Sequence, residues 1–268
     1  MILHYDIADV APYINWAYFY FAWQVKQEVE QRRMREEAEE FMVALGKRYR
    51  THALLLITAA YSENEDIVLP DAGRRIPLLR QQSGRECLCL ADFIAPASER
   101  PSDPCFSHQL GLFATSTDSG LEHDFDADPY QKMMAQLVAD RLAEATAERL
   151  HEQVRKELWG YAPDEHLSIA EMQQEHFQGI RPAVGYPSLP DASLNFILDE
   201  LLGFAQIGIT LTESGAMRPH ASVSGMMISH PSARYFSVGK IGNDQLCDYA
   251  RRRGLPVDSM RRFLSSNL

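Results

Sequence analysis

Strand-like and helix-like segments come in separate blocks along this chain rather than in strict alternation. Residues 50–117 hold short apolar runs separated by turn residues, as in HALLLITAAY and HQLGLFATST, which predicts several strands. Long helical patterns lie on either side, at residues 16–47 and 129–158. Parallel strands need a crossover helix between them, so this order favours an α+β fold with an antiparallel sheet over a doubly wound fold.

Shorter elements are predicted elsewhere. The segments RRIPLLRQQ and ECLCLADFIAP read as strands joined by a turn at Ser83–Gly84, and IGITLTESGAM and ASVSGMMISHPSARYFSVGKI read as later strands. Helices are predicted at SIAEMQQEHF, DASLNFILDELLGF, GNDQLCDYARRRG and VDSMRRFLSS. Ser168 with Glu171 would cap the first of these, while Asn243 or Asp244 would begin the third and Gly254 would end it.

Length and charge limit the class of protein. A chain of 268 residues suits one large domain or two small ones. Its net charge of -11 argues against a general nucleic-acid surface, which needs an excess of Lys and Arg. No apolar stretch reaches about 18 residues, so no membrane span is predicted. The start, MILHYDIADV, does not resemble a secretory signal, and four cysteines favour reduced thiols, which together predict a cytoplasmic protein.

Several common catalytic patterns do not occur in the sequence. There is no GxGxxG or GxxxxGK[ST] phosphate loop and no GxSxG nucleophile elbow. Cys87 and Cys89, with Cys105 and His108, could supply four zinc ligands, but buried free thiols on a strand are the favoured interpretation, so no metal is predicted. His230, in SHPS, is predicted to be a turn histidine that bonds backbone.

A rigid, irregular segment spans Gly179–Asp191, GIRPAVGYPSLPD. Its three prolines exclude a helix or a central strand and hold the neighbouring backbone extended. Arg181 offers a planar fork suited to a carboxylate, and Tyr186 adds an aromatic face and a hydroxyl. The segment is therefore a candidate ligand site. The alternative, that Arg181 is a structural arginine that ties the loop to helix carbonyls, stays open at this point.

The same segment carries a resemblance to a known family. Together with LTESGAM, ASVSGMMISHPSARYFSVGKI and DQLCDYARRRG it resembles the C-terminal activation domain of cobalamin-dependent methionine synthase. Upstream, ADRLAEATAERLHEQVRKELWGYAPDE and YINWAYFYFAW extend the similarity over nearly the whole chain. The resemblance implies a C-shaped α+β domain with a central twisted antiparallel sheet flanked by long helices. It would cover residues 1–268, with a helical part at 1–50 and an α+β body at 51–268.

The resemblance also implies a function. The family domain binds S-adenosylmethionine and serves when the cobalamin of the enzyme has been oxidised to the Co(II) state. Flavodoxin or a similar reductase then supplies an electron, and the adenosylmethionine methyl group restores methylcobalamin. Adenosylmethionine and cobalamin are therefore the expected cofactors, and the cobalamin domain and the reductase are the expected partners.

Site residues follow from the resemblance, position by position. Arg181 would hold the ligand carboxylate, Ala183 would offer backbone to adenine, and Gly185 and Tyr186 would complete the loop against ligand and corrin. Tyr186 is taken as the catalytic residue of this set. The other ligand-binding positions would be Glu144, Tyr235 and Asn15.

Some positions depart from the family pattern. The family has an acid where this chain has Asn15, and an amide can hydrogen-bond an ammonium but brings no charge. The paired tyrosines of the family are Tyr235 and Phe236 here, the loop at residues 61–66 differs, and His220 stands where the family has glycine.

The sequence shows no homocysteine, folate or cobalamin domain and no D-x-H-x-x-G motif. We therefore expect either one domain of a long enzyme or a separate subunit that docks onto a cobalamin protein. A second hypothesis is a docking or scaffold subunit that has weakened or lost adenosylmethionine binding, which Asn15 and the altered loop would support. A third, an autonomous methyltransferase, lacks an identifiable general base.

Overall fold

A four-stranded antiparallel sheet runs through the centre of the molecule, in the order β1-β2-β6-β9. The computed structural model describes residues 1–98 and 108–268. The strands are β1 (Ile2–Asp6), β2 (Arg50–Ala59), β6 (Gln109–Thr117) and β9 (Ser222–Met227). The predicted α+β class with an antiparallel sheet is confirmed.

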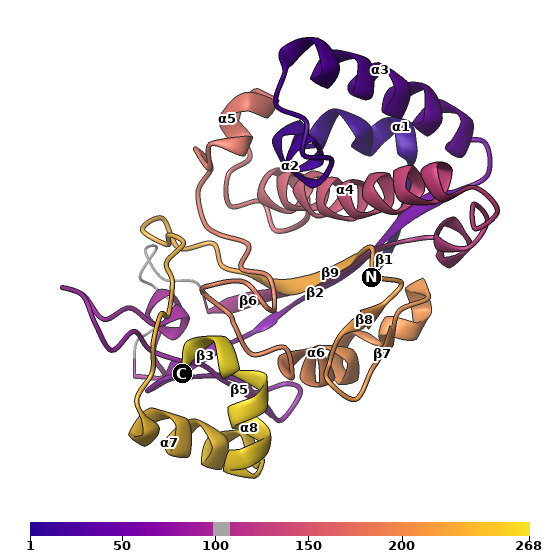
Figure 1. Ribbon diagram of the computed structural model, residues 1–268. Helices are drawn as coiled ribbons and strands as arrows, with labels where there is room; N and C mark the ends of the chain where they lie inside the picture. Colours follow the sequence, from indigo (N-terminus) through magenta and orange to yellow (C-terminus); the bar gives the residue numbers. More distant parts are fainter. Residues whose placement is uncertain (99–107) are drawn as a thin grey trace.

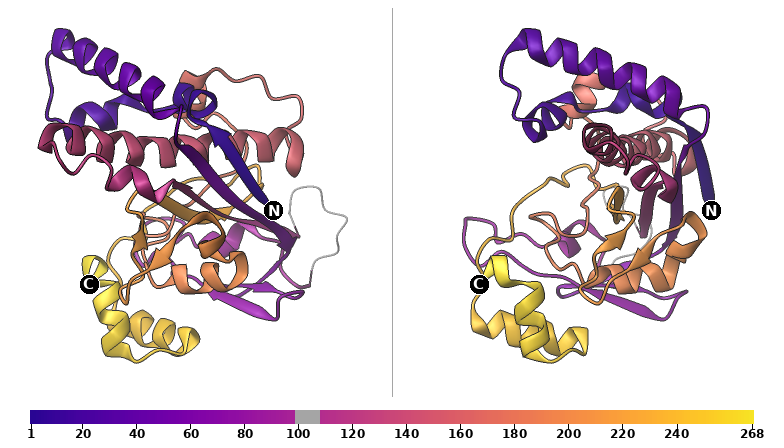
Figure 2. Two further views of the ribbon diagram at one scale, coloured as in Figure 1. Left: turned by 90° about the vertical axis from the view of Figure 1, so that its right-hand side faces the viewer. Right: turned by 45° about the vertical axis from the view of Figure 1, so that its right-hand side comes forward.

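Helices cover both faces of this sheet (Figures 1 and 2). One face carries α1 (Ile7–Val10), α2 (Trp16–Ala22), α3 (Glu28–Leu45) and the long α4 (Pro129–Gln153), and the other carries α6 (Leu194–Leu202). The last turns of α4 continue as a π-helix over Val154–Leu158. Strand residues alternate between these layers, as the pleat requires: Leu55 joins the core under α4, whereas Leu54 joins the core under α6.

The N-terminal helical pattern, predicted as one helix over residues 16–47, is instead two helices. The chain turns between α2 and α3, where Gln24 has a φ of 56°. The two helices bury different faces. The aromatic α2 packs on α4 through Phe19, whereas α3 buries Ala38 and Met42. A single straight helix cannot point both stripes at their partners, which explains the break.

Two strand predictions were wrong. ECLCLADFIAP forms a 3-10 helix at Leu90–Phe93, because Asp92 reaches back to the Cys89 N–H and closes a capping turn at 2.8 Å. In ASVSGMMISHPSARYFSVGKI only Ser222–Met227 is a strand, and the chain after His230 makes a turn and then runs without regular secondary structure up to α7. Pro231 there has no backbone N–H to donate to a strand, and the Ser232 N–H donates to the His230 side chain instead.

Helix ends largely follow the predicted signals. Ser168 and Glu171 form the capping box of α5 (Ile169–Gln173), and Gly254 ends α7 (Asn243–Arg253) with a φ of 66°. The residue before α7 is Gly242 rather than Asn243, one position from the prediction. The last helix is α8 (Val257–Phe263).

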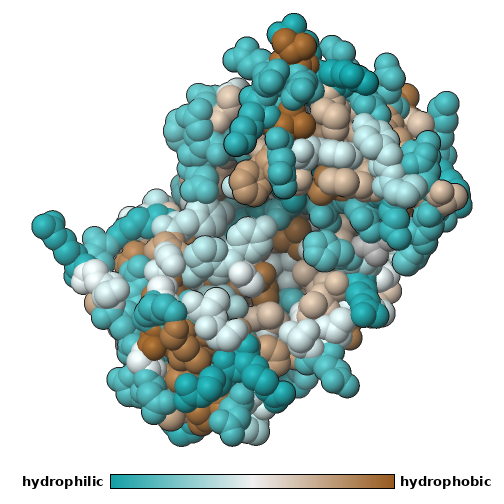
Figure 3. All heavy atoms as spheres, in the orientation of Figure 1, coloured by the Kyte–Doolittle hydropathy of each residue, from teal (hydrophilic) through white to brown (hydrophobic). Residues whose placement is uncertain are grey.

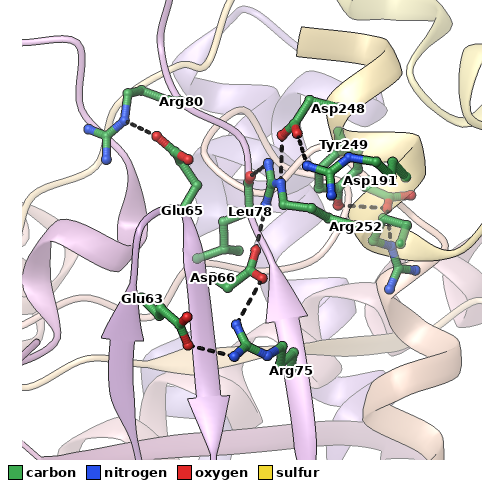
Figure 4. Close-up of polar contacts among 12 residues, drawn as sticks. Glu63, Glu65, Asp66, Arg75, Leu78, Arg80, Asp191, Asp248, Tyr249 and Arg252 are labelled. Carbon is green, nitrogen blue, oxygen red and sulfur yellow. Dashed lines mark hydrogen bonds and ion pairs between the residues drawn. The ribbon is translucent and has the colours of Figure 1, made fainter. Parts of the chain in front are cut away.

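A small sheet and the C-terminal helices form the far end of the molecule. The small sheet contains β3 (Tyr61–Glu63), β4 (Asp66–Leu69) and β5 (Arg74–Pro77), and a short hairpin pairs β7 (Thr210–Leu211) with β8 (Met217–Arg218). Charged pairs join the small sheet to α7, with Asp66 between Arg75 at 3.5 Å and Arg252 at 2.6 Å (Figure 4). These contacts fix the C-terminal helices on the body of the protein.

The helices of the described residues include none long and apolar enough to cross a membrane.

Candidate functional site

The Pro-rich segment docks along the free edge of β9 almost as a fifth strand. Ile180 and Ile228 exchange two backbone hydrogen bonds, at 2.9 and 3.0 Å. Farther along, Val184 donates to Ser224 at 2.9 Å, and the Met226 N–H donates to the carbonyl of Pro182 at 3.0 Å. Pro182 therefore lies at a position that needs only an acceptor, and its missing N–H costs nothing there.

This docking depends on a glycine in β9. A Cβ on Gly225 would lie 2.2 Å from the Pro182 carbonyl oxygen and 2.9 Å from the Ala183 Cα. Those are backbone atoms that cannot turn aside, so only glycine allows the segment to approach so closely. An isolated glycine inside a strand pattern is the sequence signal for such an approach.

A pocket of about 600 Å³ opens between this segment and the helices. The molecule is hollowed between its helical and sheet halves in Figure 3. The lining residues come from the start of α2, one face of α4, the end of α5 with the residues just after it, and the Pro-rich segment. Tyr235 and Phe236, in the irregular chain between β9 and α7, complete the lining. Its polar and charged lining residues include Asn15, Arg141, Glu144, Glu148, Glu175, Arg181, Tyr186 and Tyr235.

Arg181 is the buried cation of the pocket. Its side chain is 8% exposed, and its Nη2 donates to the carboxylate of Glu148. Burial opposes the charge, but Glu148 and the other nearby acidic groups outweigh it and raise the pKa of the guanidinium. The Nε atom is buried and has no hydrogen-bond partner in the described residues. Arg181 therefore keeps donor capacity that the protein itself does not use.

Glu144 and Glu148 are one turn apart on α4 and both face the pocket. Glu144 accepts a hydrogen bond of 2.5 Å from the Tyr186 hydroxyl. Burial and the Glu144 carboxylate raise the pKa of Tyr186, so this hydroxyl stays a donor. Tyr186 is half exposed and ties the Pro-rich segment to α4 across the pocket.

Backbone and hydroxyl groups complete the segment's side of the pocket. The Tyr235 hydroxyl accepts the backbone N–H of Arg181 at 2.9 Å, and burial raises its pKa. Ala183 is buried opposite Gly225. Gly185, with a φ of 89°, donates to Leu189 at 2.8 Å and forms the turn that presents Tyr186, but it does not line the pocket. The structure thus gathers every predicted site residue except Gly185 around one pocket.

Asn15 lies at the pocket edge with its side chain already engaged. It is the N-cap of α2, and its Oδ1 accepts the Ala17 N–H at 3.1 Å. A capping oxygen satisfies one of the donors left open at a helix start. The neutral amide therefore has a structural role that the sequence analysis did not foresee.

Two pocket acids, Glu148 and Glu175, escaped the sequence analysis. The four-residue spacing from Glu144 was the signal for Glu148. Glu175 follows α5 with a φ of 60°, and no local pattern points to it. Partial burial and the negative charge of Glu148 raise the pKa of Glu175, which indicates that the two carboxylates are close enough to repel.

A sealed polar cluster lies behind the pocket. Arg155 is fully buried and its Nε and Nη2 donate to Glu165 at 2.8 and 2.6 Å. The ring of Phe177, which lines the pocket, lies 4.4 Å from the Arg155 guanidinium carbon. His151 is also fully buried, and burial together with Arg155 and Arg181 holds its pKa well below the ordinary value.

Other predicted features lie away from the pocket. Cys89 is buried and burial raises its thiol pKa to about 12, Cys87 has a φ of 48°, and Cys105 lies outside the described residues. Among the residues that the structure does describe, no three His, Cys, Asp or Glu side chains are grouped to hold a metal ion. The turn role of His230 is confirmed, because its Nδ1 accepts the Ser232 N–H at 3.0 Å.

A second cavity of about 750 Å³ lies between α1 and α3. Its charged residues largely neutralise each other: Arg35 pairs with Glu39 at 2.7 Å, and Arg50 pairs with Asp6 at 3.1 Å. It shares no lining residue with the first pocket. We therefore place the candidate site in the smaller pocket, which is lined by several charged side chains and by Arg181, whose Nε has no hydrogen-bond partner in the described residues.

Two comparisons with known proteins agree on this chain. The family model described as "Vitamin B12 dependent methionine synthase, activation domain" matches residues 6–254. A solved structure, "Crystal Structure of the MetH Reactivation Domain bound to AdoHcy", is 36% identical in sequence with a TM-score of 0.92. The match covers 100% of this chain and 90% of that one.

Proposed function

This chain belongs to the family of vitamin B12-dependent methionine synthase activation domains, and we propose that its pocket binds S-adenosylmethionine for the reactivation of an oxidised cobalamin. One observation carries the proposal: a buried arginine with unused donors and three acids face a single cavity of about 600 Å³. The chain that shares this fold at 36% identity is bound to AdoHcy, the demethylated form of the same ligand.

The charges of the pocket suit the charges of the ligand. Adenosylmethionine carries a carboxylate, an ammonium and a sulfonium. Arg181 suits the carboxylate, because a guanidinium fork matches two oxygens. Glu144, Glu148 and Glu175 suit the two cationic groups. The three acids outnumber the two arginines of the lining, Arg141 and Arg181, so the pocket favours a ligand with net positive charge.

The remaining roles rest on position in the pocket. The backbone at Ala183 would contact adenine, and Tyr186, shaped by the turn at Gly185, would lie between ligand and acceptor at the pocket mouth. Tyr235 would support Arg181 through the hydrogen bond to its backbone N–H. Asn15 would contact the ligand only with the part of its amide that the helix cap leaves free.

The methyl acceptor would be the cobalamin of a partner methionine synthase domain, reduced by one electron from flavodoxin or a similar reductase. In that transfer the electron pair of Co(I) would form the bond to the methyl carbon, while the C–S bond would break and leave its own electron pair on sulfur, giving AdoHcy. The part of this chain is to hold the sulfonium ligand, orient its methyl group toward the mouth and keep the amino-acid end fixed by ion pairs.

Calorimetry with adenosylmethionine tests the proposal. Wild-type protein should bind, Arg181→Ala should bind at least about 30-fold more weakly, and Glu144→Gln should also weaken binding. Glu40→Gln, on the exposed face of α3, removes the same charge away from the pocket and should bind as wild type does. Absence of binding to the wild type would refute the proposal, and docking to a cobalamin domain without ligand binding would favour the scaffold hypothesis.

A further inference from the structure

We propose that the cavity between α1 and α3 is a second ligand site, which holds a medium-chain carboxylate with its head beside Lys47 and its tail toward Trp16. The inference goes beyond the proposed function, because this cavity shares no lining residue with the pocket that contains Arg181. Its volume of about 750 Å³ lies within the range that small-molecule sites occupy. The ligand is thus additional to S-adenosylmethionine.

Much of the lining of this cavity is apolar. Ile7 and Met42 are buried lining residues, whereas Val43, the next residue of α3, is 71% exposed. The other apolar side chains of the lining are Ala8, Ala11, Pro12 and Trp16. An exposed valine beside buried side chains in a concave surface leaves apolar area in contact with water. Covering that area with an apolar chain is favourable, because it removes the area from water.

The lining residues of α3 form a stripe along one face of the helix. Arg35, Glu39, Val43 and Gly46 follow each other at intervals of three or four residues, which brings them to the same side. From Arg35 to Gly46 the helix rises by roughly 17 Å. An elongated ligand fits along this stripe better than a compact one, and its two ends meet different residues.

The Arg35 end of the stripe is balanced in charge. The Arg35 guanidinium pairs with Glu39 at 2.7 Å, and its central carbon lies 5.0 Å from the centre of the Trp16 ring. Trp16 is half-buried and lines the cavity. This end therefore offers a ligand aromatic surface, and its charges already neutralise each other.

The opposite end of the stripe has one positive charge in excess. Arg50 pairs there with Asp6 at 3.1 Å, and both line the cavity. Lys47 also lines the cavity and forms no ion pair with any described residue. The whole chain has a net charge of -11, so this local excess is opposite in sign to the protein as a whole. It attracts an anionic group to this end of the cavity.

The size of the charge excess and the apolar lining together define the ligand. A carboxylate carries one negative charge, whereas a phosphate monoester carries about two at pH 7, so the single cation Lys47 suits a carboxylate better. With that head at Lys47, an aliphatic chain covers Val43 and extends along α3 toward Trp16. Dodecanoate is a probe of this class.

Calorimetry tests the site with dodecanoate below its critical micelle concentration and with saturating AdoHcy present. Wild-type protein should bind dodecanoate at least about 10-fold more tightly than octanoate, because the longer chain buries more CH₂ groups. Val43→Asp should weaken dodecanoate binding at least about 10-fold, since it places a negative charge under the chain. Lys47→Gln should weaken it about 3- to 5-fold, as expected for loss of an exposed ion pair. Both side chains are exposed, so neither change should disturb folding.

A dodecanoate brominated at the end of its tail shows where the chain lies, because bromine quenches the emission of an indole that it contacts. It should quench part of the tryptophan emission of the wild-type protein. Trp16→Phe should remove that quenching, while Trp23 and Trp159 continue to emit. The matched control Lys26→Gln removes a positive charge from the exposed turn between α2 and α3, outside the lining, and should bind dodecanoate as wild type does.

Several results would overturn the inference: no binding of dodecanoate to the wild type, undiminished binding in Val43→Asp, or quenching that persists in Trp16→Phe. Displacement of dodecanoate by AdoHcy would also overturn it, because the chain would then lie in the Arg181 pocket. Binding to phosphatidylglycerol vesicles without binding of free dodecanoate would assign the surface to a membrane instead. Failure of AdoHcy to bind, with dodecanoate binding intact, would overturn the proposed function and support the second site.

Discussion

Two of the most buried arginines in the described residues, Arg155 and Arg181, differ in how exposed their carboxylate partners are. Arg155 is fully buried, and Glu165, with 8% of its side chain exposed, chelates it through two nitrogens. Arg181 is held by Glu148 through one nitrogen, and 27% of the Glu148 side chain is exposed. The first pair is closed to solvent, whereas the second borders the pocket.

The comparison shows how identical residue types divide between structure and binding. The Arg155–Glu165 pair is closed to solvent, so even the Arg155 Nη1, which has no hydrogen-bond partner in the described residues, cannot meet a ligand, and the pair contributes to the folded structure alone. The pair of Arg181 and Glu148 lies at the wall of the pocket, so its charged groups can also contact a ligand there. Phe177 contacts both environments, because the Arg155 guanidinium lies over its ring and the same residue lines the pocket.

The largest loss of stability is expected when the buried ion pair between Arg155 and Glu165 is broken. Glu165→Gln leaves Arg155 buried without a countercharge and should lower the free energy of unfolding by about 3–5 kcal/mol. Glu148→Gln should cost only about 1–2 kcal/mol, because Arg181 can still reach pocket water and other acids. Denaturant unfolding of both variants measures the difference. An equal loss of unfolding free energy in the two variants would contradict the distinction between a structural pair and a pocket pair.

The next effect concerns ligand binding. Arg181→Lys keeps the positive charge but loses the planar fork, and should weaken AdoHcy binding about 10- to 100-fold. The matched change Arg155→Lys should lower stability and leave affinity within about 3-fold, measured by calorimetry below its unfolding temperature. A large loss of affinity in Arg155→Lys alone would contradict the division between the two arginines.

Acid should weaken the sealed cluster in particular. Burial, with the nearby charges of Arg155 and Arg181, holds the pKa of His151 well below the ordinary histidine value of about 6.5, so just below that pH only the unfolded chain takes up this proton. Stability should therefore fall as pH drops below 6.5, by up to about 1.4 kcal/mol per pH unit from this group. Unfolding at pH 7.5 and 5.5 should show a shallower dependence in His151→Gln than in wild type. The same slope in both would exclude His151 as its source.

The smallest effect is expected at Asn15. Asn15→Asp keeps a side-chain oxygen for the helix cap and adds a negative charge at the pocket edge, so adenosylmethionine binding should tighten by a few-fold. Asn15→Ala should lower the free energy of unfolding by about 1 kcal/mol through loss of the cap. Unchanged affinity in Asn15→Asp would show that this position does not contact the ligand.

Local patterns predicted much of the fold. The Ser168–Glu171 capping box, the Gly254 helix end and the runs that became β2 and β6 were readable because each depends on neighbouring residues. The break between α2 and α3 and the 3-10 turn at Leu90–Phe93 were missed because distant packing and one side-chain hydrogen bond decided them. The division of the domain at residue 50 stays a prediction.

The sequence by itself determined the family and most of the residues around the pocket, through motifs such as RPAVGYP that need no coordinates to read. Only the tertiary structure decided how those residues are partnered. The pairing of Arg181 with Glu148 joins groups that share no local pattern. The Asn15 cap is local, since Asn is a preferred residue before a helix, but only the structure shows that this cap lies at the edge of the pocket. Electrostatic and hydrogen-bond partners depend on distance and burial in the folded chain, and residues 33 positions apart come into contact only there.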